Sequence, residues 1–209
     1  MSEQRLVYLD NNATTRVAPE GVEAMLPCLT EHWGNPSSAY SLAAEPARLI
    51  EEARERVARL IGANSRNIVF TSCGTESNNA VLQGATRANL AKRHIVTTAV
   101  EHSANIKFCR QLEKRGYEVT HLPVDLDGAI DLCDLQAAIR TDTAIVSIMW
   151  ANNETGVLFP IEEIAAICRS HGVLFHTDAV QVAGKVPIDV RELGVDFLSL
   201  SAHLSLIHI

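Results

Sequence analysis

Polar side chains that could do chemistry follow five apolar stretches of the sequence, at the point where each stretch ends. They occupy residues 72–78, residues 101–102, residues 152–154, positions Asp178 and Gln181, and positions Ser201 and His203. If the apolar stretches are neighbouring parallel strands, their carboxyl ends meet at one rim, where open α/β sheets bind ligands. A helix start suits an anion, and carboxylate and imidazole groups suit proton transfer. The pattern predicts one ligand site built from five loops.

Each cluster also has a plainer structural interpretation. Residues 72–78 suit a helix N-cap supported by Glu76 as well as they suit a phosphate cradle. A lone His102 is typical of a surface or core histidine, residues 152–153 are typical of a turn, and Asp178 could simply cap the next helix. Ser201 and His203 could be ordinary loop residues. The coincidence of all clusters on one rim favours a site over five separate structural roles.

Alternating apolar and amphipathic segments predict the elements that position these residues. Apolar residues at helical spacing predict early helices over residues 19–29 and 46–61. A short strand is expected over residues 5–9. Further strands are expected over residues 67–71, 94–98, 118–122, 144–150, 173–177 and 197–200, and helices over residues 75–89, 104–115, 132–139 and 161–171. This alternation predicts an α/β fold with a mostly parallel sheet sandwiched by helices.

Composition excludes several functional classes. Of the 209 residues, 47% are hydrophobic and 21% are charged, as in a globular chain with a buried core. The formal net charge of −7 argues against a nucleic-acid partner. The longest apolar run, residues 144–151, is far shorter than the ~20 residues of a bilayer span, so no membrane partner is expected. Residues 1–9 lack the features of a secretory signal, which predicts a cytoplasmic location.

The cysteines give no sign of a disulfide framework or a zinc site. There are five, widely spaced and without a C-x-x-C pair, namely Cys28, Cys73, Cys109, Cys133 and Cys168. We therefore expect no metal, and we expect most of these thiols to act as small buried hydrophobes. Cys73 differs from the others because its glycine-containing turn could face a site.

Seven motifs in order resemble the cysteine desulfurases of the NifS/IscS type, which belong to the class-V aminotransferase group of fold-type I pyridoxal-phosphate enzymes. The resemblance runs from about residue 6 to residue 203 and covers about half of a typical family member. Its motifs occupy residues 8–15, 34–38, 70–79, 100–102, 151–156, 176–181 and 198–203. Seven collinear motifs are far more specific than any one of them.

The resemblance implies pyridoxal 5'-phosphate as cofactor and a role for each polar residue of the rim. Asp178 would lie beside the pyridine nitrogen, and His102 would stack on the ring and take part in proton transfer, which makes it the catalytic residue of this chain. Gly74 and Thr75 would hold the phosphate at a helix start. Ser201 and His203 would join them there, and Asn153 and Gln181 would bind the oxygen side of the ring.

The sequence departs from the family at its end. The family places a lysine that forms a Schiff base with the cofactor directly after the equivalent of His203, where this chain has Leu204. A cysteine that carries the sulfur as a persulfide comes later in the family. Because both residues are missing, we expect the chain to be inactive by itself. Milder departures are residues 43–44, in place of a glycine-containing stretch, and Ser103, in place of a proline.

The resemblance divides the chain into three parts. Residues 1–15 are expected to form an N-terminal segment that would join a missing small domain, and residues 16–203 an incomplete cofactor-binding large domain. Residues 204–209 fit no family continuation. They can be encoded by a transposase adapter end used in sequencing libraries, so we interpret them as an assembly artefact.

The implied activity is conversion of L-cysteine to L-alanine, with sulfur passed to an enzyme cysteine for iron-sulfur cluster assembly. Sulfur-acceptor or scaffold proteins are the implied partners, and the family is homodimeric. Two alternatives stay open: a related class-V enzyme such as a selenocysteine lyase, and a non-catalytic truncated protein that binds a full-length partner.

Overall fold

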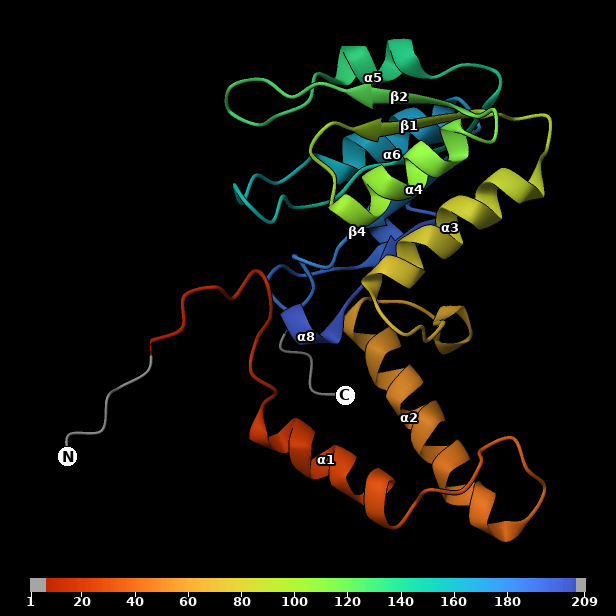
Figure 1. Cartoon of the computed structure of the whole chain (residues 1–209), viewed down its shortest axis with the longest axis vertical. Coiled ribbons are helices and arrows are strands. Elements are labelled where there is room, and N and C mark those ends of the chain that lie inside the picture. Colours follow the sequence, from red (N-terminus) through yellow and green to blue (C-terminus); the bar gives the residue numbers. More distant parts are fainter. Residues whose placement is uncertain (1–6, 206–209) are drawn as a thin grey trace.

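The structure, a computed structural model, describes residues 7–205. Five parallel strands form the centre of the fold (Figure 1). Their spatial order is β2-β1-β3-β4-β5, and every pairing is parallel. The strands are β1 (His94–Thr98), β2 (Glu118–Leu122), β3 (Thr143–Ser147), β4 (Leu174–Asp178) and β5 (Phe197–Ser199). The predicted parallel α/β sheet is confirmed, and all five carboxyl ends lie at one edge.

Helices cover both faces of this sheet, as the alternation predicted. On one face α3 (Gly74–Ala88) packs beside α4 (Ser103–Glu113), and on the other α5 (Leu132–Ala138) packs beside α6 (Ile161–Ser170), with the short α7 (Val190–Leu193) next to α6. A last short helix, α8 (Ala202–Ser205), follows β5. The bounds of α3, α4, α5 and α6 differ from the predicted ones by two residues at most, whereas α7 and α8 were not predicted.

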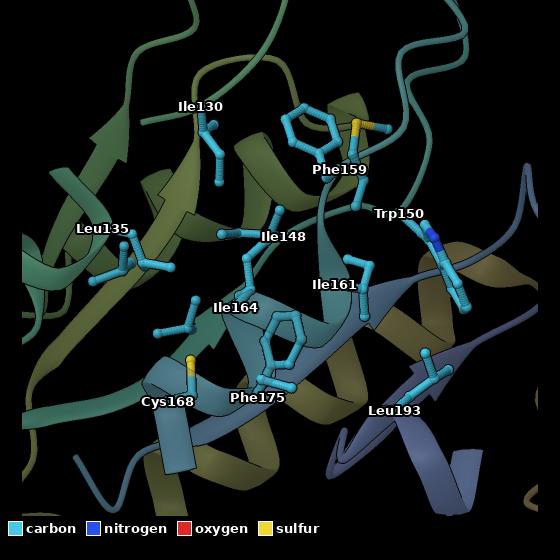
Figure 2. Packing of buried hydrophobic residues seen from close by; sticks show 14 of the residues in the cluster. Ile130, Leu135, Ile148, Trp150, Phe159, Ile161, Ile164, Cys168, Phe175 and Leu193 are labelled. Atoms are coloured by element: carbon cyan, nitrogen blue, oxygen red, sulfur yellow. The ribbon is translucent and has the colours of Figure 1, made fainter. Parts of the chain in front are cut away.

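Alternate residues of the central strands enter opposite cores. Ile95 and Ile145 pack with α3 and α4, whereas Val96 and Val146 pack with the larger cluster under α5 and α6. All four side chains are fully buried, as expected for strands covered on both faces. Figure 2 shows the larger cluster, in which Ile164 of α6 lies against the strands together with Phe175.

Two buried histidines join neighbouring strands within the sheet. The His94 ring lies 2.8 Å from the Thr143 hydroxyl and 2.8 Å from the Thr120 hydroxyl. His176 makes the same arrangement on β4, with both ring nitrogens 2.9 Å from a hydroxyl, those of Ser147 and Ser199. Burial lowers the pKa of His176 to about 3, so its ring is neutral at ordinary pH.

The first third of the chain extends away from the sheet (Figure 1). It consists of α1 (Pro19–Thr30), a short 3₁₀ helix η1 (Ser41–Ala43) and α2 (Ala44–Leu60). Gly62 ends α2 with φ of +68°, and a Cβ there would lie 2.5 Å from the Asp189 carboxylate. Glycine is therefore required at this turn for both conformation and space.

The strand predicted over residues 67–71 is wrong. Asn67 ends a 3₁₀ helix, η2 (Ser65–Asn67), and residues 68–71 after it form no strand. A cavity of about 920 Å³ is lined by this segment on one side and by β5 on the other, so neither finds a strand partner there among residues 7–205. Val69 is consequently exposed. Of the strand expected over residues 5–9, residues 7–9 are irregular, and residues 5–6 lie outside the described part.

Candidate functional site

A cavity of about 470 Å³ lies at the carboxyl ends of the strands, and all eight residues predicted to bind a cofactor line it. Its wall comes from the N-terminal segment and from the loops after several strands. The lining residues are Asp10, Asn12, Ala13, Cys73, Gly74, Thr75, Asn78, His102, Met149, Ala151, Asn153, Glu154, Asp178, Val180, Gln181, Ser201, His203 and Leu204. The predicted convergence on one rim is therefore present, while the cofactor roles stay predictions.

The N-terminus of α3 forms one wall of the cavity. Cys73 is its N-cap and makes no side-chain capping hydrogen bond, so the first amides of the helix are not capped by that residue. Glu76 accepts a hydrogen bond of 2.6 Å from the amide of Ser72, the residue before the N-cap, so its side chain supports the helix start. Both predicted roles of residues 72–78 are thus compatible with the geometry: Glu76 supports the turn, and Gly74 and Thr75 face the cavity.

Gly74 allows this helix to approach the rest of the rim closely. A Cβ at Gly74 would lie 3.3 Å from Cγ2 of Val180 and 3.8 Å from Cβ of Ser201. The loops after β4 and β5 therefore meet the start of α3 at one point. Cys73, next to it, is exposed, and the Glu76 amide followed by the Ser72 hydroxyl lowers the pKa of its thiol.

Asp178 is the buried carboxylate of the site. It ends β4 with 6% of its surface exposed. Asn78 donates a hydrogen bond of 2.6 Å to Oδ2, and the Val180 amide donates one of 3.0 Å to Oδ1. Burial raises the pKa of Asp178, and these two donors oppose that effect. Asn78 holds this carboxylate, a role that a cap-like sequence motif did not reveal.

His102 lies at the N-cap of α4 and faces the cavity from the loop after β1. The Ala104 amide donates a hydrogen bond of 3.2 Å to Nδ1 of its ring. With Nδ1 acting as an acceptor, a neutral ring carries its proton on Nε2. That nitrogen is the one available for proton exchange with a ligand.

Glu101, immediately before His102, is buried, and its contribution was missed by sequence reasoning. It accepts hydrogen bonds from the Thr98 hydroxyl, the Met149 amide and the Asn105 side chain. Burial is the largest cause that raises its pKa, to about 7. Only its position beside His102 could have pointed to it, because burial cannot be read from a Val-Glu-His sequence.

The two asparagines after β3 have different roles. The Asn152 carbonyl oxygen accepts hydrogen bonds of 2.9 Å from the amides of Glu154 and Thr155, and its amide group donates one of 3.1 Å to the Val100 carbonyl. Asn152 is therefore the turn residue that the plainer interpretation predicted. Asn153 lines the cavity, and its side chain donates to Glu154 at 2.7 Å.

The N-terminal segment crosses the cavity and is hydrogen-bonded to three of its loops. The Asn12 side chain donates a hydrogen bond of 2.8 Å to the Asn153 carbonyl. The Asn12 carbonyl accepts a hydrogen bond of 3.0 Å from the Gln181 side chain. The Thr15 hydroxyl donates 2.6 Å to the His203 carbonyl. Lys185 donates 3.1 Å to Gln181, which fixes the side chain of that residue. Sequence reasoning placed this segment by resemblance alone.

The residues present fit a phosphorylated pyridine cofactor. The start of α3 offers amides and the Thr75 hydroxyl to a phosphate, and Asp178 offers a buried carboxylate to a ring nitrogen. The described part of the wall contains no lysine, and Leu204, 7% exposed, occupies the position after His203.

No cluster of three or more His, Cys, Asp or Glu residues within 7–205 is arranged to hold a metal ion. No helix in that range is long and apolar enough to cross a membrane.

The comparisons with known proteins agree with one another. The aminotransferase class-V family model matches residues 7–206. "Cysteine desulfurase 2" of Trichormus variabilis is 54% identical over 198 residues, which is 95% of this chain and 50% of that protein. "Cysteine desulfurase NifS" of Azotobacter vinelandii is 49% identical over 94% of this chain and 49% of its own length.

Solved structures give the same result. A "NIFS-like protein" superposes with a TM-score of 0.92 at 41% identity, covering 95% of this chain and 55% of that one. "SspA in complex with cysteine" superposes with a TM-score of 0.93 at 38% identity, covering 95% and 58%. The chain thus spans about half the length of the curated relatives that it matches.

Proposed function

The chain belongs to the class-V aminotransferase family, and from this premise we propose that it is the cofactor-binding part of a pyridoxal-phosphate-dependent cysteine desulfurase. Relatives that are 54% and 49% identical over the 198 aligned residues carry that name, and one similar structure is described as a complex with cysteine. L-Cysteine is the proposed substrate. An enzyme cysteine outside these residues would receive the sulfur and pass it to acceptor or scaffold proteins, and the whole enzyme would be a homodimer in the cytoplasm.

The observation that carries the proposal is the cavity that gathers all eight predicted residues around a buried carboxylate. The start of α3, with Gly74 and Thr75, would bind the phosphate, and Ser201 and His203 would complete that subsite. Asp178, oriented by Asn78, would hold the ring nitrogen in its protonated form.

The remaining residues orient the ring and move protons. Asn153 and Gln181 would bind its oxygen side, and the N-terminal segment contacts the backbone carbonyl of Asn153 and the side chain of Gln181. When bound, the cofactor supplies an electron sink for the substrate. His102 would exchange a proton at Nε2, because Nδ1 is engaged by the Ala104 amide.

Binding of pyridoxal 5'-phosphate tests the proposal directly. Asp178→Ala should weaken binding by about tenfold or more, because it removes a buried, charge-assisted contact. Asp134→Asn on α5 is the control, since Asp134 is exposed and far from the cavity lining. The measurement is a fluorescence titration at pH 7.5 with circular dichroism as a check of folding. Equal affinity of wild type and a folded Asp178→Ala would refute the assigned cavity.

A further inference from the structure

Glu101 is a buried carboxyl group that the proposed function leaves without a role. It is 5% exposed and lies in the turn between β1 and α4, one residue before His102. A carboxyl group is rarely buried to this extent without a partner. Its surroundings therefore indicate what it does.

Glu101 connects three elements through its two carboxyl oxygens. Oε1 accepts a hydrogen bond of 2.8 Å from the Thr98 hydroxyl at the end of β1 and one of 2.9 Å from the Met149 amide after β3. Oε2 accepts one of 3.2 Å from the Asn105 side chain on α4. Glu101 thus attaches the turn from Thr98 to Asn105 to the end of β3, beside the hydrogen bond of 3.1 Å that Asn152 donates to the Val100 carbonyl.

His102 sits in the middle of that turn. Its own ring contact, from the Ala104 amide, is made within the same turn and orients the imidazole relative to α4. The contacts of Glu101 orient the turn relative to the sheet. Without them, the imidazole would keep its local geometry, but only the Asn152–Val100 hydrogen bond would still join the turn to the segment after β3, so its place in the cavity wall would be less fixed.

Glu101 also faces a second buried carboxyl group. The titratable groups around it are Asp178 at the end of β4, His102 beside it and Cys109 on α4. The Cys109 thiol is neutral, since burial raises its pKa to about 12. Nearby, Oδ1 of Asn78 and Oδ1 of Asn105 are buried acceptors without a donor in the described structure. Because this part of the wall is rich in hydrogen-bond acceptors, it disfavours the simultaneous ionisation of Glu101 and Asp178.

We propose that Glu101 is a positioning residue, which holds His102 in the cavity wall and sets the negative charge next to Asp178. The proposal rests on the proposed cofactor site and deepens it. At low pH the carboxyl group is protonated and resembles a glutamine side chain. At higher pH it is ionised, binds its three donors more strongly and adds a negative charge that favours a protonated ring nitrogen in the ligand.

The experiment compares three variants of the 209-residue chain with wild type. Glu101→Gln keeps an acceptor for Thr98 and Met149 but cannot ionise. Glu101→Ala removes every contact. Glu113→Gln, at the exposed end of α4, is the matched control for loss of one carboxylate from the same region. Affinity for pyridoxal 5'-phosphate is measured by fluorescence at pH 6 and pH 8.5. The dissociation constant of each variant is divided by that of wild type at the same pH, so that the titration of the free ligand cancels.

The expected result is a ratio of dissociation constants, Glu101→Gln over wild type, that is near one at pH 6 and about threefold or more at pH 8.5. Glu101→Ala should bind about tenfold more weakly at both pH values, with Glu101→Gln restoring most of that loss at pH 6. A ratio that is the same at both pH values would overturn the proposal even if Glu101→Ala does not fold.

Amide hydrogen exchange tests the positioning role without any ligand. In folded Glu101→Ala, residues 98–105 should exchange about tenfold faster than in wild type, with α6 unchanged as the internal reference. Unchanged exchange over residues 98–105 would contradict the role. If wild type itself binds no pyridoxal 5'-phosphate, the proposed function fails, and the exchange result still decides whether Glu101 holds the turn.

Discussion

At the residue scale, Leu204 determines whether the cavity can hold an aldehyde covalently. It lines the cavity beside His203 and is 7% exposed. We predict that Leu204→Lys, incubated with pyridoxal 5'-phosphate and treated with borohydride, carries an adduct at position 204. Wild type should carry none in that peptide. Leu126→Lys, on a fully exposed loop position, controls for non-specific labelling. Mass spectrometry of the peptides reads the result, and equal labelling at positions 126 and 204 would contradict the prediction.

Two buried groups should give the free energy of unfolding a distinctive dependence on pH. The pKa of Glu101 is raised to about 7 from 4.5, so its contribution is complete below pH 4.5 and is lost as pH rises through 7. The loss amounts to about 3 kcal/mol. The pKa of His176 is lowered to about 3 from 6.5, so its contribution is complete above pH 6.5 and is lost as pH falls toward 3.

Between about pH 4.5 and pH 6.5 the two opposite slopes cancel, which predicts a plateau of stability, with the loss from His176 below it and the last part of the loss from Glu101 between pH 6.5 and about 7. Glu101→Gln should remove the loss from Glu101, so that stability rises with pH up to about pH 6.5 and shows no alkaline decline. Urea unfolding from pH 3.5 to pH 8.5 measures both, with Glu113→Gln as the control. An alkaline decline that persists unchanged in Glu101→Gln would mean that another group causes it.

The sequence named the residues that line the cavity better than those that support them. Asp178 ends β4, His102 follows β1 and His203 follows β5, and strand order alone brings strand ends together. Asn78 and Glu101 act through burial and through partners distant in the chain. Such contacts depend on packing between elements, which no local pattern of residue types encodes.

At the scale of elements, α6 contributes the best-buried apolar face. Ile164 is fully buried against the strands, next to Phe175 (Figure 2). Ile164→Ala should lower the free energy of unfolding by about 2–5 kcal/mol, because it removes buried methyl groups and leaves a cavity. Ile50→Ala, at a half-exposed position of α2, should cost less than about 1 kcal/mol. Urea unfolding compares the two, and similar losses would contradict the described burial.

Helices and central strands were predictable, whereas the strand over residues 67–71 was not. In α2 and α6 the apolar residues recur at helical spacing, so the local sequence is enough to predict a helix. The strands β1 and β3 are apolar enough to be predicted as buried on both faces of the sheet. Residues 68–71 are equally apolar, but a strand also needs a neighbour. Here a cavity separates them from β5, so their composition could not produce pairing.

At the scale of the molecule, exposed apolar side chains are concentrated in the first third of the chain. Of the 19 exposed large apolar residues in the described part of the chain, 15 lie before residue 71, including Met25, Leu26 and Leu29 on α1. A surface of this kind promotes association. We predict self-association at micromolar concentration, measured by light scattering after size-exclusion chromatography. Leu26→Lys with Leu29→Lys should reduce it, whereas Leu126→Lys should not. A monomeric wild type would contradict this prediction.

The N-terminal segment that crosses the cavity also sets an order of events during synthesis. Thr15 bonds to His203, which lies 188 residues later, and Asn12 bonds to Gln181, 169 residues later. At about 5–20 residues per second, a ribosome needs roughly 10–40 seconds between making these partners. The strands and helices between them can fold while the first segment waits. The first segment of the chain can therefore complete the cavity only after the strands and helices between these partners have been synthesised.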